Sequence, residues 1–74
     1  MTSKAQEFSE YLSFLLEKYQ ISDKHFEDKT DIPPIYIESL KSGNLPDAKA
    51  YKVIRNYLSS KITNEELHDF DMLY

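Results

Sequence analysis

Apolar residues recur at intervals of three and four positions along most of this sequence. In the N-terminal segment they are Phe8, Tyr11, Leu12, Leu15, Leu16 and Tyr19. This spacing puts them on one stripe of an α-helix, which completes a turn about every 3.6 residues. No segment shows the alternation of apolar and polar residues that a half-buried strand requires. The pattern predicts an all-α fold.

The short length and the absence of cysteine limit how such a fold is stabilised. The chain has 74 residues and no cysteine, so neither a disulfide nor a cysteine-based zinc site contributes. A chain of this length buries only about 60% of its unfolded surface. We therefore expect one domain over residues 1–74, held together by apolar packing. A deep substrate cleft is not expected, and a recognition protein is favoured over an enzyme.

The first half of the chain predicts two helices. The first covers roughly residues 4–19. The second is about two turns long, with Ser22 as N-cap and Phe26 directed inward. Asp31 ends it, since aspartate tolerates the left-handed conformation of a tight turn.

Pro33 and Pro34 fix where the third helix begins. A proline restricts the residue before it to extended conformations, so this helix starts no earlier than about Pro34, a position that suits the first turn. It continues to Lys41 or Ser42. Gly43 ends it, because glycine readily takes the left-handed cap.

The second half of the chain predicts two more helices. One follows Pro46 with Asp47 near its cap, and its inner residues are Ala50, Tyr51, Ile54, Tyr57 and Leu58. The last begins at Thr63 or Asn64 and buries Leu67, Phe70 and Leu73. The expected architecture is a compact bundle of about five short helices.

Residues 21–43 resemble, without a gap, the helix-turn-helix of the lambda-repressor-like Cro/CI (XRE-type) family. The matching positions are Ile21, Ser22 and Phe26 in the first helix, Asp31 and Ile32 at the turn, and Ile37, Leu40 and Gly43 in the second helix. The first helix, residues 46–58 and the segment ITNEEL are also similar to the family, so nearly the whole chain is covered. The resemblance implies a five-helix lambda-repressor-like bundle with its motif at about residues 21–43.

The chain departs from the family pattern at four positions. Glu27 stands where the family has a small alanine, Thr30 where it has a buried leucine, and Asp31 where it has the turn glycine. Pro33 replaces the serine or threonine that caps the second helix. Because a carboxylate between packed helices must reach solvent or a partner, Glu27 indicates slightly splayed helices.

Charge is unevenly distributed along the chain. The net charge is −4, which argues against strong affinity for nucleic acid, since Lys and Arg supply most of that affinity. Residues 1–40 and 62–74 each carry −4, but residues 41–61 hold five basic residues and one acidic residue, for +4. This segment indicates a basic face. Ordinary solvated faces of mixed charge are the alternative.

The outward side of the third helix is the candidate binding surface. With Ile37 and Leu40 turned inward, the outward residues are expected to be Pro34, Ile35, Tyr36, Glu38, Ser39 and Ser42. Candidates for contact with DNA phosphates are Lys41, Asn44, Lys49 and Lys52. The outward set lacks the Arg, Lys, Asn and Gln side chains that bind base edges best, whereas Ile35 and Tyr36 suit a protein interface. Alternatively, these two residues pack against Tyr51 or Leu45 at the edge of the core.

Two functions follow from these observations. By resemblance, the protein is a small phage or bacterial transcription regulator that binds operator DNA. The alternative is an antirepressor or modulator that keeps the fold but binds a partner protein, such as a repressor's DNA-binding domain. Neither a cofactor nor a metal is expected: the sequence has no Gly-rich phosphate loop, zinc-ligand spacing or nucleophile motif. His25 and His68 are isolated on solvated faces, so no enzyme activity is expected.

Two further expectations concern location and assembly. The segment MTSKAQEFSE has no apolar core of a signal peptide, and no apolar run approaches the ~20 residues that span a bilayer. A soluble cytoplasmic protein without membrane association is expected. Phe70, Leu73 and Tyr74 crowd the C-terminus and are candidates for a homodimer contact. Alternatively, Phe70 and Leu73 close the core of the monomer.

Overall fold

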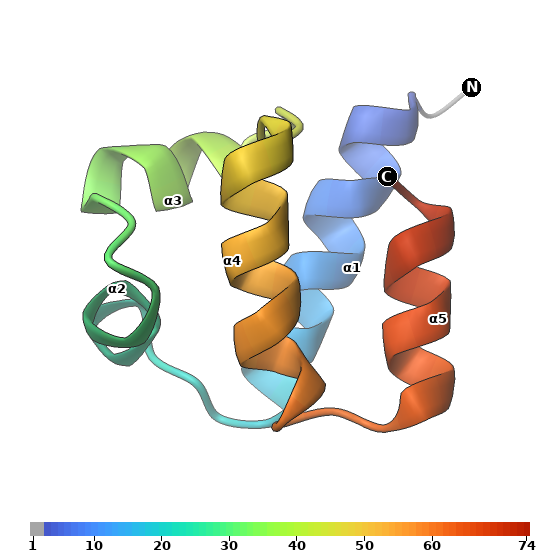
Figure 1. Ribbon diagram of the computed structural model, residues 1–74. Helices are drawn as coiled ribbons and strands as arrows, with labels where there is room; N and C mark the ends of the chain where they lie inside the picture. Colours follow the sequence, from blue (N-terminus) through green and yellow to red (C-terminus); the bar gives the residue numbers. More distant parts are fainter. Residues whose placement is uncertain (1–2) are drawn as a thin grey trace.

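Five α-helices make up the regular structure of residues 3–74, the part of the chain that the computed structural model describes. They are α1 (Lys4–Lys18), α2 (Asp23–Thr30), α3 (Pro34–Lys41), α4 (Ala48–Ser59) and α5 (Asn64–Met72). In Figure 1, α1 and α4 both lie beside α5, and α2 and α3 lie together, with α2 against α4 and α3 against α1. The predicted all-α fold and the five expected helices are confirmed.

One hydrophobic core unites these helices. Its thirteen buried members are Phe8, Leu12, Leu15, Leu16, Ile21, Phe26, Ile32, Ile37, Leu40, Ile54, Leu58, Ile62 and Phe70. They come from all five helices and from the connections between them. No helix has a core of its own, so each depends on the others for burial of its apolar stripe.

Side-chain caps explain where four of the helices begin. Ser3, Ser22, Asp47 and Thr63 each accept a hydrogen bond from the backbone N–H three residues later. Thr63 and Glu66 form a reciprocal capping box. Helix α3 differs, because Pro33 occupies its N-cap position and makes no side-chain bond. Its start depends on proline geometry instead.

Backbone conformation confirms the expected ends of α2 and α3. Asp31 takes the left-handed conformation with φ 61°, and its N–H donates to the Glu27 carbonyl at 2.8 Å. Gly43 has φ 102°, just after α3. The segment of residues 31–33 is therefore a tight connection between two short helices that pack against each other.

Thr30 and Glu27, the unusual polar residues of α2, are each accommodated without an unpaired buried polar group. Thr30 is buried, and its hydroxyl donates to the Phe26 carbonyl one turn earlier, at 2.6 Å. Thr30 can therefore occupy a buried site without an unpaired polar group. Glu27 is only half-buried, so its carboxylate keeps contact with solvent.

The C-terminal helix corrects one expectation. Phe70 was a candidate for a homodimer contact, but its side chain has no exposed surface and packs on the rings of Phe8 and Tyr51, with centroids 4.8 and 5.6 Å away. Tyr74 stacks on Tyr51 with centroids 3.9 Å apart, and its hydroxyl donates to the Pro46 carbonyl at 3.0 Å. Leu73 and Tyr74 are half-buried. Phe70 therefore closes the core of the monomer and has no surface left for a second copy.

Candidate interaction surface

Helix α3 presents an outer face that no other described element covers. Ile37 and Leu40 are 2% and 1% exposed, which confirms the predicted inward register. Pro34, Glu38 and Ser39 are exposed, and Ile35 is 77% exposed. This face is a candidate for contact with another molecule, because Ile35 is the most exposed large apolar side chain in residues 3–74.

Tyr36 does not share that face, contrary to expectation. Its side chain is half-buried against the core, and its hydroxyl accepts a hydrogen bond from the Asp47 N–H at 3.1 Å. Tyr36 thus joins α3 to the start of α4. Tyr36 therefore lies at the edge of the core with Asp47 as its hydrogen-bond partner, whereas Ile35 stays exposed.

The first turn of α3 offers few donors to an anion. Helix N-termini bind phosphate through free backbone N–H groups, but Pro33 and Pro34 have none. The N–H groups of Tyr36 and Ile37 both donate to the Pro33 carbonyl, at 3.0 and 3.1 Å. Only the N–H of Ile35 remains at this end of the helix. The start of α3 is therefore a poor phosphate site.

Three of the expected polar contacts are used within the protein itself. Lys41 forms an ion pair with Asp23. The Asn44 amide donates to the Ser39 carbonyl at 3.1 Å, and the Ser42 hydroxyl donates to the Glu38 carbonyl at 2.8 Å. These side chains complete the end of α3, so binding a ligand through them would cost internal bonds.

In the basic segment of residues 41–61, Arg55 is also engaged by a partner within the protein. Its guanidinium donates to both carboxylate oxygens of Asp71, at 2.9 to 3.1 Å. This hydrogen bonding raises the pKa of Arg55 and lowers the pKa of Asp71. Lys49 and Lys52 are exposed and make no ion pair with any residue in 3–74. They are the expected phosphate contacts that stay available.

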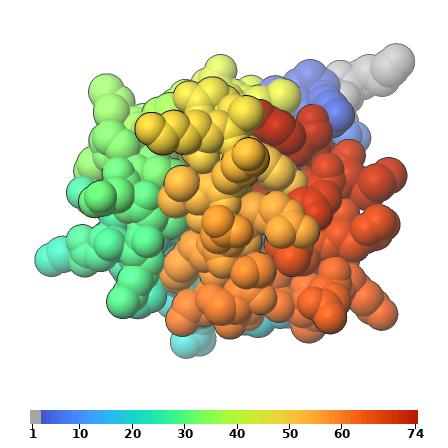
Figure 2. Space-filling model, in the orientation of Figure 1, coloured from blue at the N-terminus to red at the C-terminus, as the bar shows by residue number. Residues whose placement is uncertain are grey.

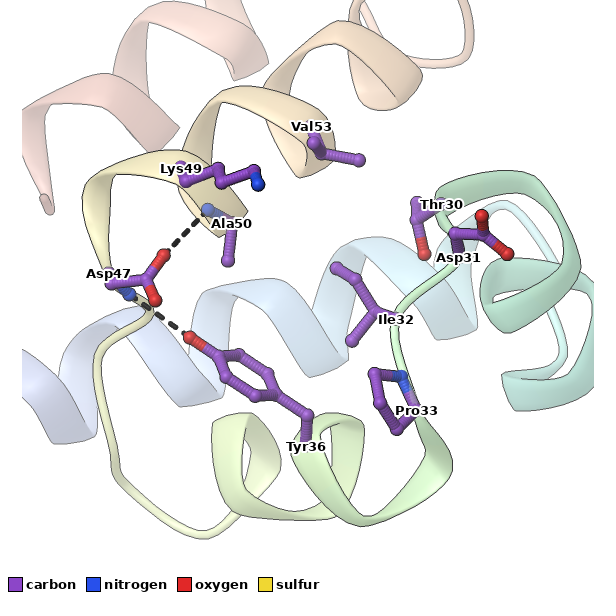
Figure 3. Close-up of a pocket in the computed structure, with 9 residues that line it drawn as sticks. All are labelled: Thr30, Asp31, Ile32, Pro33, Tyr36, Asp47, Lys49, Ala50 and Val53. Atoms are coloured by element: carbon purple, nitrogen blue, oxygen red, sulfur yellow. Dashed lines mark hydrogen bonds between the residues drawn. The ribbon is translucent and has the colours of Figure 1, made fainter.

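A groove lies between the α2–α3 connection and the first turns of α4 (Figure 3). We call it the α3–α4 groove. Its volume is about 410 Å³, and its lining residues are Thr30, Asp31, Ile32, Pro33, Tyr36, Asp47, Lys49, Ala50 and Val53. Figure 3 shows the Tyr36 ring reaching across toward Asp47, with Asp31 and Lys49 on opposite sides. Apolar side chains form most of the walls, and charges occupy the rim.

Carboxylates outnumber ammonium groups around this groove. A smaller depression lined by Glu27, Asp28, Asp31, Ile32 and Pro33 adjoins it and shares its last three residues. Together the two hollows carry four carboxylates, those of Glu27, Asp28, Asp31 and Asp47, against the single ammonium of Lys49. Sequence analysis missed this site. The feature of the sequence that relates to this groove is Ala50, whose small side chain leaves space beside α4.

A second charged cluster joins α5 to α1. The Glu66 carboxylate accepts a hydrogen bond from Lys18 Nζ at 2.6 Å and others from the Tyr19 hydroxyl and the Thr63 N–H. These bonds lower the pKa of Glu66 to about 2, with that from Lys18 contributing most. Because every member has an internal partner, the cluster stabilises the bundle and offers no free group to a ligand.

Figure 2 shows the surface on which these features meet. Helix α4, yellow to orange, lies between the green segment of α2 and α3 and the red α5.

Within residues 3–74, no three His, Asp or Glu side chains are arranged to hold a metal ion. None of the helices in this part of the chain is long and apolar enough to span a bilayer.

Comparison with known proteins finds no matching family model, no matching curated protein and no matching solved structure.

Proposed function

We propose that this protein is a small regulator of transcription with a lambda-repressor-like helix-turn-helix, and that it binds a partner regulatory protein through the outer face of α3. A repressor's DNA-binding domain is a partner of the right kind. The observation that carries the proposal is Ile35, an apolar side chain that is 77% exposed on a helix whose start is fixed by two prolines.

The helix-turn-helix part of the proposal is supported by α2, α3 and their connection. Two helices of eight residues pack against each other across a turn in which Asp31 is left-handed. In such motifs the second helix leaves its outer side free for its target. Helix α3 has its outer side free, and its inner residues Ile37 and Leu40 anchor it to the core.

Chemistry favours a protein over DNA as the target of this helix. Arg, Lys, Asn and Gln make the strongest contacts to base edges, and Lys41 is the only residue of these types in α3. Lys41 is paired with Asp23. Glu38 adds a negative charge that phosphates repel. Exposed apolar side chains such as those of Pro34 and Ile35, by contrast, are typical of the centres of protein interfaces.

Operator DNA is the second candidate target, because Lys49 and Lys52 are exposed without an internal ion pair. Both lie in α4, next in the chain after the α3 surface. Two ammonium groups of this kind suit phosphate contacts that position a protein on a duplex. Base contacts would then fall to Ile35 and Ser39.

Salt dependence distinguishes the two targets. If Lys49 and Lys52 contact phosphates, the log–log slope of affinity against salt should include about −0.9 for each contact. Lys49→Glu should then weaken binding to a duplex pool, while Lys61→Glu, beyond the opposite end of α4, should not. We expect the 74-residue chain to show no duplex binding even at low salt. Steeply salt-dependent binding that Lys49→Glu removes would overturn the protein-partner proposal in favour of DNA.

Partner capture tests the α3 surface directly. A lysate of the source cells is passed over the immobilised protein, and the retained proteins are identified by mass spectrometry. We expect a DNA-binding regulator that Ile35→Ser no longer retains. Met72→Ser is the matched control, since Met72 is 68% exposed on α5. Ile35 is a cleaner probe than Tyr36, because a change at Tyr36 also breaks its bond to Asp47. Equal retention by both variants would refute the role of α3.

A further inference from the structure

We propose that the α3–α4 groove is the docking site for a short protein segment that carries an apolar side chain beside a Lys or Arg. The inference rests on the proposed function, because it names the chemistry of the partner segment that binds next to the outer face of α3. It adds a second contact region, formed by residues 30–33 and 47–53. Substitutions in this region leave the outer face of α3 unchanged.

The size and walls of the groove suit one apolar side chain with its neighbours. Its volume of about 410 Å³ falls within the range of about 300–1,000 Å³ typical of ligand pockets. Pro33 and Val53 form opposite walls, and Ile32 lies at the base (Figure 3). Ala50 keeps the space between them open because its side chain is a single methyl group. Burial of an apolar group here removes apolar surface of both partners from water.

The groove is already formed in the free protein. Asp47 is held twice, since its N–H donates to the Tyr36 hydroxyl at 3.1 Å and its carboxylate accepts from the Ala50 N–H at 2.8 Å. Pro33 fixes the opposite wall, and its φ of −61° is set by its own ring. A ligand therefore binds without first ordering these residues, which lowers the entropic cost of association.

The charges around the groove determine which residue type of the ligand can lie beside its apolar side chain. Glu27, Asp28 and Asp31 gather at the α2 side of the groove, and the Asp31 carboxylate makes no hydrogen bond or ion pair with any residue in 3–74. Lys49 lies on the α4 side. A cationic residue of the ligand therefore belongs beside Asp31 and away from Lys49. Nucleic acid is a poor occupant, since its phosphates would meet these carboxylates.

Peptide titration of the isotopically labelled full chain tests this inference. The probes are eight-residue peptides with a central Leu flanked by Arg, the same peptides with Arg replaced by Glu, and a third set with Leu replaced by Ser. We expect saturable amide NMR shifts from the Arg–Leu peptides at Asp31, Ile32, Ala50 and Val53. The Glu and Ser sets should bind at least about tenfold more weakly, as expected when a charge becomes repulsive or an apolar anchor is lost.

Single charge changes on the protein should act in opposite directions. Asp31→Asn should weaken the Arg–Leu peptides about two- to fivefold, and Lys49→Gln should strengthen them by a similar factor, in keeping with the modest strength of exposed charge pairs. Asparagine accepts the left-handed conformation at position 31, so the turn is preserved. Met72→Ser is the control that should leave peptide binding unchanged, because Met72 is exposed on α5 and does not line the groove.

Each result either supports the docking site or overturns it. No saturable shift from any Arg–Leu peptide, equal binding of the Glu peptides, or shifts confined to residues outside the groove would each overturn it. If partner capture depends on Ile35 while these peptides fail, the proposed function stands and the groove proposal falls. If the peptides bind in the groove while capture is insensitive to Ile35, the α3 proposal falls instead.

Discussion

Replacing Phe70 by alanine should be the most damaging change in α5. Phe70 is the only fully buried residue of that helix, and its ring contacts Phe8 and Tyr51 with centroids 4.8 and 5.6 Å away. Deleting a buried Phe side chain costs about 3–5 kcal/mol. Aromatic pairs add about 0.5–1.5 kcal/mol beyond buried area, so Phe70→Ala should lie near the upper end of this range.

Such a loss is large for a domain of 74 residues. Stability of about 0.05–0.15 kcal/mol per residue gives roughly 4–11 kcal/mol in total. Each kcal/mol shifts the Tm of a domain of this size by about 4–8 °C, so the variant should melt at least about 12 °C lower than the unmodified protein. Part of the population would be unfolded already at room temperature if the starting stability lies at the low end.

Urea titration followed by circular dichroism measures the change, at two protein concentrations tenfold apart. Met72→Ala is the matched control and should stay within about 0.5 kcal/mol, since Met72 is 68% exposed. The loss in Phe70→Ala should not depend on protein concentration, because Phe70 acts within one chain. A loss of less than about 1 kcal/mol, or one that appears only at the lower concentration, would refute the assignment of Phe70 to the monomer core.

Other variants test the register of α3, a backbone turn and a titrating contact. Leu40→Ala should lower the unfolding free energy by about 2–5 kcal/mol and Ser39→Ala by no more than about 0.5 kcal/mol; equal losses in urea titration would show that the inward face is misassigned. Gly43→Ala should cost at least about 1 kcal/mol, because L residues rarely adopt its φ of 102°; the new Cβ would also lie 2.9 Å from Gln6 Oε1, which an exposed side chain can relieve by moving. Adding Gln6→Ala should restore only the part caused by the clash, as thermal unfolding of the double variant would reveal. Glu66 has a folded-state pKa of about 2 against an ordinary value of 4.5, so its contribution is present above about pH 4.5 and is lost as the pH falls toward 2. The midpoint of urea unfolding should therefore fall less on acidification in Glu66→Gln than in the unmodified protein, and parallel curves would contradict this role.

Local rules account for the parts of the fold that were predictable from sequence. Ser22 caps α2, Asp31 ends it in a left-handed conformation, and Pro34 begins α3, all as expected. Each of these features depends on residues within about one turn of the chain. The inward register of Ile37 and Leu40 was predictable for a similar reason, because spacing along a helix fixes which side chains share a face.

Contacts between distant residues account for what was missed. Tyr36 turns toward the core because its hydroxyl meets the Asp47 N–H, eleven positions along the chain. Lys41 was expected to contact phosphate but pairs with Asp23, eighteen positions away. The α3–α4 groove was not foreseen either, since its walls come from two separate segments, residues 30–33 and 47–53. No periodicity within one helix carries information of this kind.

The hydroxyl of Tyr74 donates a hydrogen bond to the Pro46 carbonyl at 3.0 Å. This bond holds the C-terminal residue close to the loop before α4. Figure 1 shows this end of the chain beside the top of α1, close to that loop. A fluorophore attached just after Tyr74 would therefore sit near Pro46 and Asp47 without replacing any residue that lines the groove. Because the sequence has no tryptophan, a tryptophan in an incoming peptide would be the only indole present, and energy transfer to such a label would report arrival of the peptide directly.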